Sequence, residues 1–311
     1  MSRALVFPGQ GAQYVGMGVE LAQRFPAARA LLSEADRVLG FALSDIMANG
    51  PESDLTRTDV SQPAIFVASA MSLAVAEEAL QPLTRAACAG LSLGEYTALY
   101  AAGAIGFAEA LRLVRLRGQA MQAAAEATPG GMVALIGADE AQARALCAEA
   151  AAGEVLTVAN LNSPGQVVIS GARGACVRAL ELAKKHGIRR ATSLAVAGAF
   201  HSPLMQPAAE RLAEAVAALS WRDPQRPVYS NVTAAPLTRA SEIPELLVRQ
   251  LTSPVRWADS VRALHAAGIS EFLELGPGKT LCGMIARTVE GVQCRNLDTA
   301  EDVRALVAAG A

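Results

Sequence analysis

Short apolar runs alternate with longer alanine-rich segments along most of the chain. The short runs are typical of buried strands, and the longer segments repeat apolar residues at helical spacing. We expect strands at 4–7, 85–89, 228–230 and 271–275, and helices at 14–24, 27–39, 61–80, 93–102, 107–126, 203–218, 241–252, 257–267 and 279–288. This alternation predicts an α/β fold.

The pattern changes after the break at Thr128-Pro129-Gly130-Gly131. Strand-like and helical segments then follow one another at 132–136, 139–151, 155–161, 166–170, 173–186 and 190–194. Their order, β-α-β-β-α-β, is that of the ferredoxin-like unit. We therefore expect a small domain at 128–195, inserted into a large domain formed by 1–127 and 196–311. An insertion of this kind creates a cleft, which is a common place for a ligand site.

Composition narrows the classes of protein. Of the 311 residues, 52% are hydrophobic and 18% are charged, which indicates a globular chain with a large core. The net charge of −2 offers no electrostatic basis for binding nucleic acid. The most apolar stretch, 60–76, contains Ser61, Gln62 and Pro63 and is expected to be a buried helix, not a membrane span. Without a signal peptide at its start, the chain is expected to be soluble and cytoplasmic.

Neither the cysteines nor the histidines show a recognisable ligand pattern. The five cysteines (Cys88, Cys147, Cys176, Cys282 and Cys294) include no C-x-x-C spacing, and we expect free thiols. The three histidines (His186, His201 and His265) do not pair at the spacing of metal ligands, so no metal site is expected.

The segment Gly90-Leu-Ser92-Leu-Gly94 has the G-x-S-x-G pattern of a nucleophile elbow. An apolar run precedes it and a helical run follows it, as a strand-to-helix turn requires. Glycines on both sides of Ser92 allow the close approach of the backbone. The N–H of Leu93, at the start of the helix, can then face a developing oxyanion. The alternative is a serine that only caps the helix.

A serine nucleophile needs a base, and His201 is the best candidate. It lies in "AVAGAFHSPLM", where the chain returns from the inserted domain to the large one. His186 lies in a basic helix end, and His265 lies near a helix C-terminus, where the helix dipole explains it.

For the third member of a triad, Asp223, Asp259 and Glu274 are all available, and none stands out. A backbone carbonyl could orient the imidazole equally well.

Two glycine-rich segments fail as phosphate-binding loops. "FPGQGAQYVGMG" has Tyr14 where G-x-G-x-x-G needs its last glycine. For "LGPGKT", residues 275–280, the pattern G-x-x-x-x-G-K-T needs a glycine before the segment, at the position of Leu273. Both are expected to be turns that line or brace a site. Gln10, in the first of them, could offer a second backbone N–H to an oxyanion.

Arg117 is out of place on its helix. In 107–122, Arg112 and Arg115 fall on the polar face, but Arg117 falls in the middle of the apolar face. A buried guanidinium needs an anionic partner, because it does not lose its proton in proteins. The partner is either a ligand or an internal carboxylate such as Glu109 or Glu126.

Taken together, these segments resemble a known family. "FPGQGAQ", "GLSLGEYTAL", "RLVRLRGQAMQ", "NLNSPGQVVISG", "GAFHSPLM", "VYSNVTA", "RQLTSPVRW" and "LELGPGKTL" occur in the order seen in malonyl-CoA:acyl-carrier-protein transacylases, over about residues 4–297. The resemblance implies an α/β-hydrolase-like core with a ferredoxin-like insert. It implies an S-malonyltransferase that moves malonyl groups from malonyl-CoA to the phosphopantetheine thiol of an acyl carrier protein, for fatty-acid or polyketide synthesis. The resemblance implies a ping-pong reaction through a malonyl-serine, with no cofactor, and we expect a monomer.

The resemblance also implies roles for single residues. Ser92 is the acylated nucleophile, His201 its base, and the main-chain carbonyl of Gln250 orients that histidine. Arg117 binds the malonyl carboxylate. Acetyl-CoA has no such carboxylate and would leave the arginine unpaired, so the site rejects it. The remaining implied positions are Gln10 and Leu93 as oxyanion donors, and Met121, Asn162 and Phe200 near the acyl pocket, where Phe200 would crowd a methyl-branched group.

Four further observations concern a departure from the family pattern, a surface cluster and two alternative functions. Leu91 stands where many relatives have histidine before the serine, which does not affect the chemistry of the nucleophile. Lys184, Lys185, Arg189 and Arg190 form a basic cluster that could steer an acidic carrier protein or could simply be solvated. A serine hydrolase fits the elbow and the histidine equally well, but the buried-face arginine argues against a general esterase. Ser92, His201 and Arg117 together argue against a non-catalytic scaffold.

Overall fold

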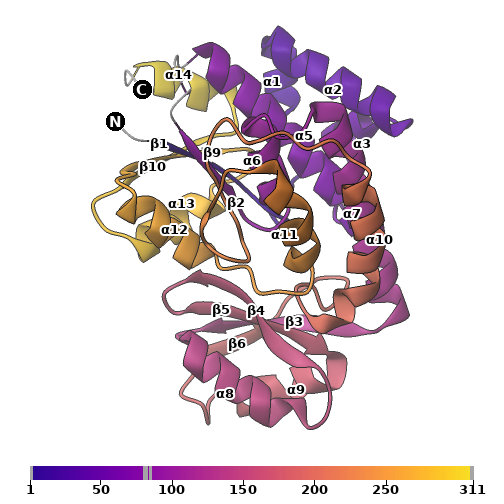
Figure 1. Cartoon of the computed structure of the whole chain (residues 1–311), viewed down its shortest axis with the longest axis vertical. Helices are drawn as coiled ribbons and strands as arrows, with labels where there is room; N and C mark the ends of the chain where they lie inside the picture. The colour runs from indigo at the N-terminus through magenta and orange to yellow at the C-terminus, as the bar shows by residue number, and fades with distance from the viewer. Residues whose placement is uncertain (1–2, 80–82, 84–85, 309–311) are drawn as a thin grey trace.

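The computed structural model describes residues 3–79, 83 and 86–308. It is a mixed α/β fold with two separate sheets (Figure 1). The larger sheet has the strand order β10-β9-β1-β2-β7-β8, with parallel pairing except between β7 and β8. Its strands are β1 Arg3–Phe7, β2 Ala87–Gly90, β7 Val228–Tyr229, β8 Pro236–Leu237, β9 Glu271–Leu275 and β10 Gln293–Leu297.

Helices cover both faces of this sheet, as the alternation along β1 requires. Leu5 and Phe7 point into the main core, whereas Ala4 and Val6 point into a second core on the opposite face. The helices associated with this sheet are α1 Val19–Arg24, α2 Pro26–Leu39, α3 Leu43–Asn49, α4 Glu52–Leu55, α5 Thr58–Ala79, α6 Gly94–Ala101, α7 Phe107–Ala127, α10 Gln206–Ala217, α11 Ile243–Gln250, α12 Trp257–Ala266, α13 Thr280–Thr288 and α14 Ala300–Ala308, with 3-10 turns at Pro203–Met205 and Ala240–Glu242.

Helix α5 is long and apolar enough to cross a membrane by length and composition alone. However, 89% of its most apolar window is buried inside the protein. It packs against α2, α6 and α7 in the main core. The expected buried helix is thus confirmed.

The second sheet is antiparallel and has the order β4-β5-β3-β6. It is formed by β3 Gly130–Ile136, β4 Leu156–Ser163, β5 Gln166–Ala172 and β6 Arg190–Ser193, with helices α8 Glu140–Ala151 and α9 Arg173–Leu182. These two helices share a separate core with the sheet and lie at one end of the molecule (Figure 1). Met132 and Val168 project from the opposite face of the sheet into the main core. The element order between 130 and 193 is the predicted one.

Backbone hydrogen bonds join the second sheet to the rest of the chain. Val255, just before α12, donates its N–H to Ala159 O at 2.8 Å, and its carbonyl accepts from Leu161 N at 2.9 Å. The segment that follows α11 therefore extends the edge of β4 like a short extra strand.

Some predicted boundaries were wrong. The helix expected at 14–24 begins only at Val19, because Gly16 and Gly18 adopt positive φ angles of 99° and 74°. Helices α3, α4 and α14 and strands β8 and β10 were not predicted. Arg85, in the expected strand 85–89, and Leu80, at the end of the expected helix 61–80, lie outside the described residues.

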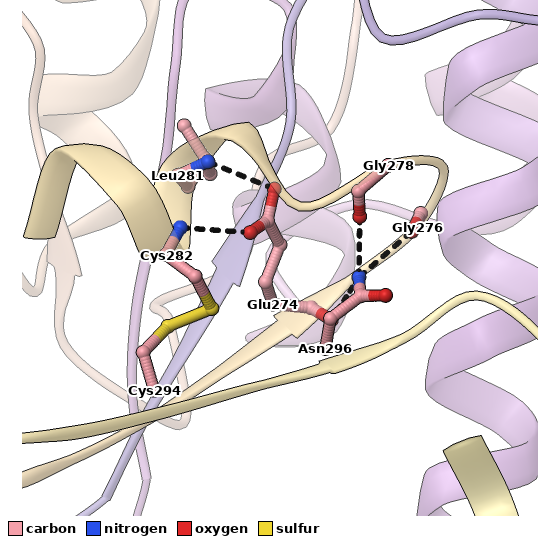
Figure 2. Close-up of a disulfide and its surroundings, with 7 residues drawn as sticks. All are labelled: Glu274, Gly276, Gly278, Leu281, Cys282, Cys294 and Asn296. Carbon is pink, nitrogen blue, oxygen red and sulfur yellow. Dashed lines mark hydrogen bonds between the residues drawn. A yellow bond between two sulfur atoms is a disulfide. The ribbon is translucent and has the colours of Figure 1, made fainter.

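The expectation of five free thiols was also wrong. Cys282, in the first turn of α13, forms a disulfide with Cys294 on β10 (Figure 2). Their Cα atoms lie 5.3 Å apart, well within the range that a disulfide bridges. Spacing along the chain could not reveal the pair, since it depends on the packing of α13 against β10. Cys88, Cys147 and Cys176 are free and buried.

Candidate active site

Ser92 lies at the apex of the sharp turn between β2 and α6. It adopts φ 52°, a left-handed conformation that is strained for a residue with a side chain. The turn needs its glycines: a Cβ at Gly90 would lie 2.0 Å from Gly94 C, and a Cβ at Gly94 would lie 2.1 Å from Phe7 O. The predicted elbow geometry is therefore present, with the serine held out from the end of the strand.

The His201 side chain meets the Ser92 side chain directly. Its Nε2 lies 2.7 Å from Ser92 Oγ, and its Nδ1 lies 2.8 Å from the main-chain carbonyl of Gln250. A carbonyl only accepts, so Nδ1 carries the proton and Nε2 is left to accept from the hydroxyl. Burial, and then the nearby charge of Arg117, lower the pKa of His201 to about 4. The imidazole is thus neutral and ready to accept a proton at neutral pH.

The other two histidines have partners elsewhere. His186 Nε2 lies 2.9 Å from the Glu149 carboxylate, and His265 Nδ1 lies 3.2 Å from Ile269 O. Both contacts occur at helix ends, as the sequence predicted for residues without a part in catalysis.

None of the three candidate acids orients His201. Asp223 accepts from Ala240 N at 2.7 Å, and Asp259 pairs with Arg262 at 2.9 Å. Glu274 accepts from two backbone N–H groups in the first turn of α13 (Figure 2). The imidazole is instead held by a backbone carbonyl, the alternative that the sequence left open.

Arg117 is buried, with 1% of its surface exposed, and it lies beside the nucleophile. Its Nη2 donates to Ser92 Oγ at 2.9 Å and to Gln250 Oε1 at 3.0 Å, while Nη1 donates to Gln62 Oε1 at 2.7 Å. The guanidinium also lies over the ring of Tyr96, 5.2 Å from its centroid. Burial lowers the pKa of this arginine from its ordinary value. All three of its hydrogen-bond partners, Ser92, Gln250 and Gln62, are neutral groups.

The internal salt bridge considered for Arg117 was wrong. Glu109 accepts from Gly106 N at the start of α7, and Glu126 accepts from Gln122 one turn away. Neither carboxylate contacts the guanidinium.

A cavity of about 360 Å³ opens in front of Ser92. Its wall includes six of the predicted site residues: Gln10, Ser92, Met121, Asn162, Phe200 and His201. Leu91, where many relatives have histidine, lines it too, as do Thr280, Leu281 and Met284 of α13. Arg117, Gln250 and Leu93 are not among the residues that line it. Arg117 reaches the cavity through its contact with Ser92 Oγ.

The backbone N–H groups of Gln10 and Leu93 make no hydrogen bond within residues 3–79, 83 and 86–308. Gln10 lines the cavity beside Ser92, and Leu93 directly follows the nucleophile. Such free donors are what an oxyanion hole requires. Across the described part of the chain, no group of three or more His, Cys, Asp or Glu side chains could hold a metal ion.

Sequence reasoning missed three buried polar residues at the site. Asn231 Oδ1 accepts from Ser92 N at 2.7 Å, and Asn231 Nδ2 donates to Gly90 O at 2.7 Å. Glu95 accepts from Gln250 Nε2 at 2.6 Å, and Gln62 holds Arg117. Asn231 and Glu95 belong to the segments "VYSNVTA" and "GLSLGEYTAL", but their contacts span more than 130 residues of sequence.

Comparisons with known proteins agree with this geometry. The family model described as "Acyl transferase domain" matches residues 4–310. The malonyl CoA-acyl carrier protein transacylase of Bacillus subtilis is 44% identical over 286 residues, which cover 91% of this chain and 89% of the relative. The crystal structure of an acyl-carrier-protein-S-malonyltransferase from Bartonella henselae superposes with a TM-score of 0.95 at 38% identity, covering 100% of this chain and 99% of that one.

A second solved structure includes a partner. It is a malonyl-transacylase in complex with a type II polyketide acyl-carrier protein, with a TM-score of 0.94 and 39% identity, covering 99% of this chain and 100% of that one. The sequence relatives and the structural neighbours carry the same kind of name, and the family model spans nearly the whole chain. This chain therefore belongs to the malonyl CoA-acyl carrier protein transacylase family.

Proposed function

We propose that the protein transfers malonyl groups from malonyl-CoA to the phosphopantetheine thiol of an acyl carrier protein. The observation that carries this proposal is that Ser92 Oγ is shared by His201 at 2.7 Å and by Arg117 at 2.9 Å. A base and a fixed cation therefore meet at one hydroxyl. An acyl group on that hydroxyl with its own carboxylate, as malonyl has, can pair with the guanidinium in a planar two-pronged contact.

The reaction proceeds in two halves. His201 Nε2 takes the proton of Ser92 as Oγ attacks the thioester carbonyl of malonyl-CoA. The N–H groups of Gln10 and Leu93 stabilise the tetrahedral oxyanion, each by about 3–4 kcal/mol. The C–S bond then breaks, and His201 returns the proton to the departing CoA sulfur. The carrier thiol attacks the malonyl-serine and reverses these steps, so that the ester is broken and Ser92 regains its proton.

Gln250 orients His201 through its main-chain carbonyl, and Met121, Asn162 and Phe200 shape the acyl pocket. The bulk of Phe200 disfavours a methyl-branched acyl group. No cofactor takes part in these steps. The basic cluster at Lys184, Lys185, Arg189 and Arg190 is proposed to attract the acidic carrier, although Lys185 already pairs with Glu149.

The fold assignment goes with this function. We assign residues 1–127 and 196–311 to an α/β-hydrolase-like domain and residues 128–195 to an inserted ferredoxin-like domain. The strand order β4-β5-β3-β6 and the element order β3-α8-β4-β5-α9-β6 support the second assignment. We further propose that the protein acts as a cytoplasmic monomer. In a reducing cytoplasm Cys282 and Cys294 would be held as thiols, so the disulfide between them is expected to form only under oxidising conditions.

Intact-mass spectrometry tests the function. The wild type mixed with malonyl-CoA should gain one malonyl group, S92A should gain none, and acetyl-CoA should label the wild type weakly. Adding holo carrier protein should remove the adduct and yield malonyl carrier. If no adduct forms and malonyl-CoA stays intact after carrier is added, the transferase proposal fails. If CoA is released over many turnovers at the same rate without carrier thiol, the protein is a hydrolase.

A further inference from the structure

The side-chain amide of Gln250 connects the two halves of the site. Its Oε1 accepts from Arg117 Nη2 at 3.0 Å. Its Nε2 donates to Ser92 O at 3.0 Å and to Glu95 Oε2 at 2.6 Å. The two ends of an amide differ, since the oxygen only accepts and the nitrogen only donates. If this amide turned over, its NH₂ would face the donors of Arg117, and its oxygen would face a carbonyl and a carboxylate.

Glu95 is the group that enforces one orientation. It is buried, with 1% of its surface exposed, and its ionised carboxylate can only accept hydrogen bonds. Besides Gln250, the same oxygen accepts from Asn231 N at 3.2 Å, so the carboxylate itself is held in place. No lysine or arginine pairs with Glu95 within the described residues. Burying a carboxylate without a cationic partner costs free energy of folding, which indicates that Glu95 has a role beyond stability.

The orientation of Gln250 matters most for Arg117. Two side-chain amide oxygens hold the guanidinium, one from Gln62 and one from Gln250. Arg117 Nε has no hydrogen-bond partner among the described residues. If the Gln250 oxygen turned away, Nη2 would keep only Ser92 Oγ as a partner, and one amide oxygen instead of two would hold the guanidinium.

We propose that Glu95 is a positioning residue for malonyl transfer: it orients the Gln250 amide, and Gln250 thereby sets Arg117 beside Ser92. The inference rests on the proposed function, because Arg117 needs its place only for a substrate with a free carboxylate. Loss of the acceptor at position 95 should therefore affect malonyl-CoA far more than acetyl-CoA. A residue that merely supports the fold would affect both substrates equally.

Three variants separate these roles. E95M removes the acceptor at similar length and should lower the malonyl-over-acetyl preference in kcat/KM by about 10-fold or more, mainly through a higher KM for malonyl-CoA. E95Q keeps an oxygen that can accept and should stay within about threefold of the wild type. E95D keeps the charge on a side chain that is one methylene shorter, and its malonyl-over-acetyl preference should lie between those of E95M and E95Q. If E95M fails to fold, E95D carries the test.

A matched control is E274M. Glu274 is also fully buried and also accepts two hydrogen bonds, but it caps α13 (Figure 2). Because α13 lines the cavity, the change should lower stability and could weaken both thioesters, but Glu274 holds neither Arg117 nor Gln250, so the malonyl-over-acetyl preference should stay unchanged. Burial raises the pKa of Glu95 to about 7, so the assays belong at about pH 8, where the carboxylate is ionised.

The outcomes are distinguishable. If the wild type forms no malonyl-serine, the proposed function fails and this inference fails with it. If the wild type transfers malonyl and both E95M and E95D keep its preference for malonyl, Glu95 positions nothing and only this inference is overturned. A preference that falls equally in E274M would also overturn it.

Discussion

Arg117 donates directly to the nucleophile, with its Nη2 2.9 Å from Ser92 Oγ. The same oxygen lies 2.7 Å from His201 Nε2, so one hydroxyl receives a hydrogen bond from a cation and gives one to a neutral base. The cation that is proposed to select the acyl group is thus in contact with the atom that would carry it. A single hydrogen bond therefore joins the side chain proposed to select the substrate to the atom proposed to be acylated.

The first prediction concerns this cation. R117A should lower kcat/KM for malonyl-CoA by about 100-fold, because a charge-assisted contact to the malonyl carboxylate is lost. Acetyl-CoA, which has no carboxylate, should lose much less. R117K should not restore the preference, since an ammonium cannot make the planar contact. Steady-state kinetics with both thioesters decide the matter, and an R117A variant that still prefers malonyl-CoA would contradict it.

The second prediction concerns pH. Burial and Arg117 lower the pKa of His201 to about 4, so the neutral base persists well below neutrality. Acylation of Ser92 by malonyl-CoA should change by no more than about threefold from about pH 8 to about pH 5, where Glu95 takes up its proton but keeps an accepting oxygen, and should then fall by half near pH 4. Rapid-quench mass spectrometry gives the rate, and circular dichroism at each pH shows whether the protein is still folded. A half-point near pH 6.5 would mean that the imidazole is not desolvated.

The same shift affects stability with a definite sign. In the unfolded chain an imidazole takes up its proton at about pH 6.5, whereas buried His201 stays neutral to about 4. Its contribution is therefore complete above about pH 6.5 and is lost as the pH falls from there toward 4. H201Q should show a shallower decline in the free energy of unfolding over this window than the wild type.

The third prediction concerns the disulfide. Protein unfolded without reductant should show three reactive thiols, from Cys88, Cys147 and Cys176, and reduced protein should show all five. Closing a loop of this size stabilises a fold by up to about 3 kcal/mol, so reductant should lower the free energy of unfolding by that order. C294S should be insensitive to reductant. Five reactive thiols in oxidising buffer would show that the bridge does not form.

The fourth prediction compares two glycines. A Cβ at Gly90 would lie 2.0 Å from Gly94 C, a backbone atom that cannot move without opening the elbow. G90A should therefore cost more than about 3 kcal/mol in the free energy of unfolding. A Cβ at Gly283, within α13, would meet nothing within 4 Å. G283A should instead stabilise the protein by about 0.5–1 kcal/mol, measured by urea unfolding.

Local patterns were enough to predict much of this structure. Three correct predictions came from short segments. The glycines around Ser92 predicted the strand-to-helix turn, and the alternation between 130 and 193 predicted the order of the elements there. The junction sequence singled out His201, which the structure places beside Ser92. Arg117 was detectable because one charge interrupts an apolar helix face. The turn at Gly16 and Gly18 was missed, since helical spacing of apolar residues says nothing about a positive φ angle.

The support around these residues could not be predicted from local patterns. Asn231 and Glu95 meet Ser92 and Gln250 across sequence separations of 139 and 155 residues. Only the folded sheet brings such segments together. The same holds for the pair of Cys282 and Cys294, which depends on the packing of a helix against an edge strand that the sequence did not predict.

The short backbone bridge at Val255 has a consequence for engineering. Because Val255 pairs with Ala159 and Leu161, residues 128–195 cannot be exchanged alone without affecting these hydrogen bonds. A chimera that exchanges only this segment between relatives would keep the host's 253–256 against a foreign β4 edge. Grafts that carry 253–256 together with 128–195 preserve both hydrogen bonds. Gln250, whose main-chain carbonyl orients His201, lies only a few residues before this bridge. A mismatched graft that displaced 253–256 would therefore also displace that carbonyl.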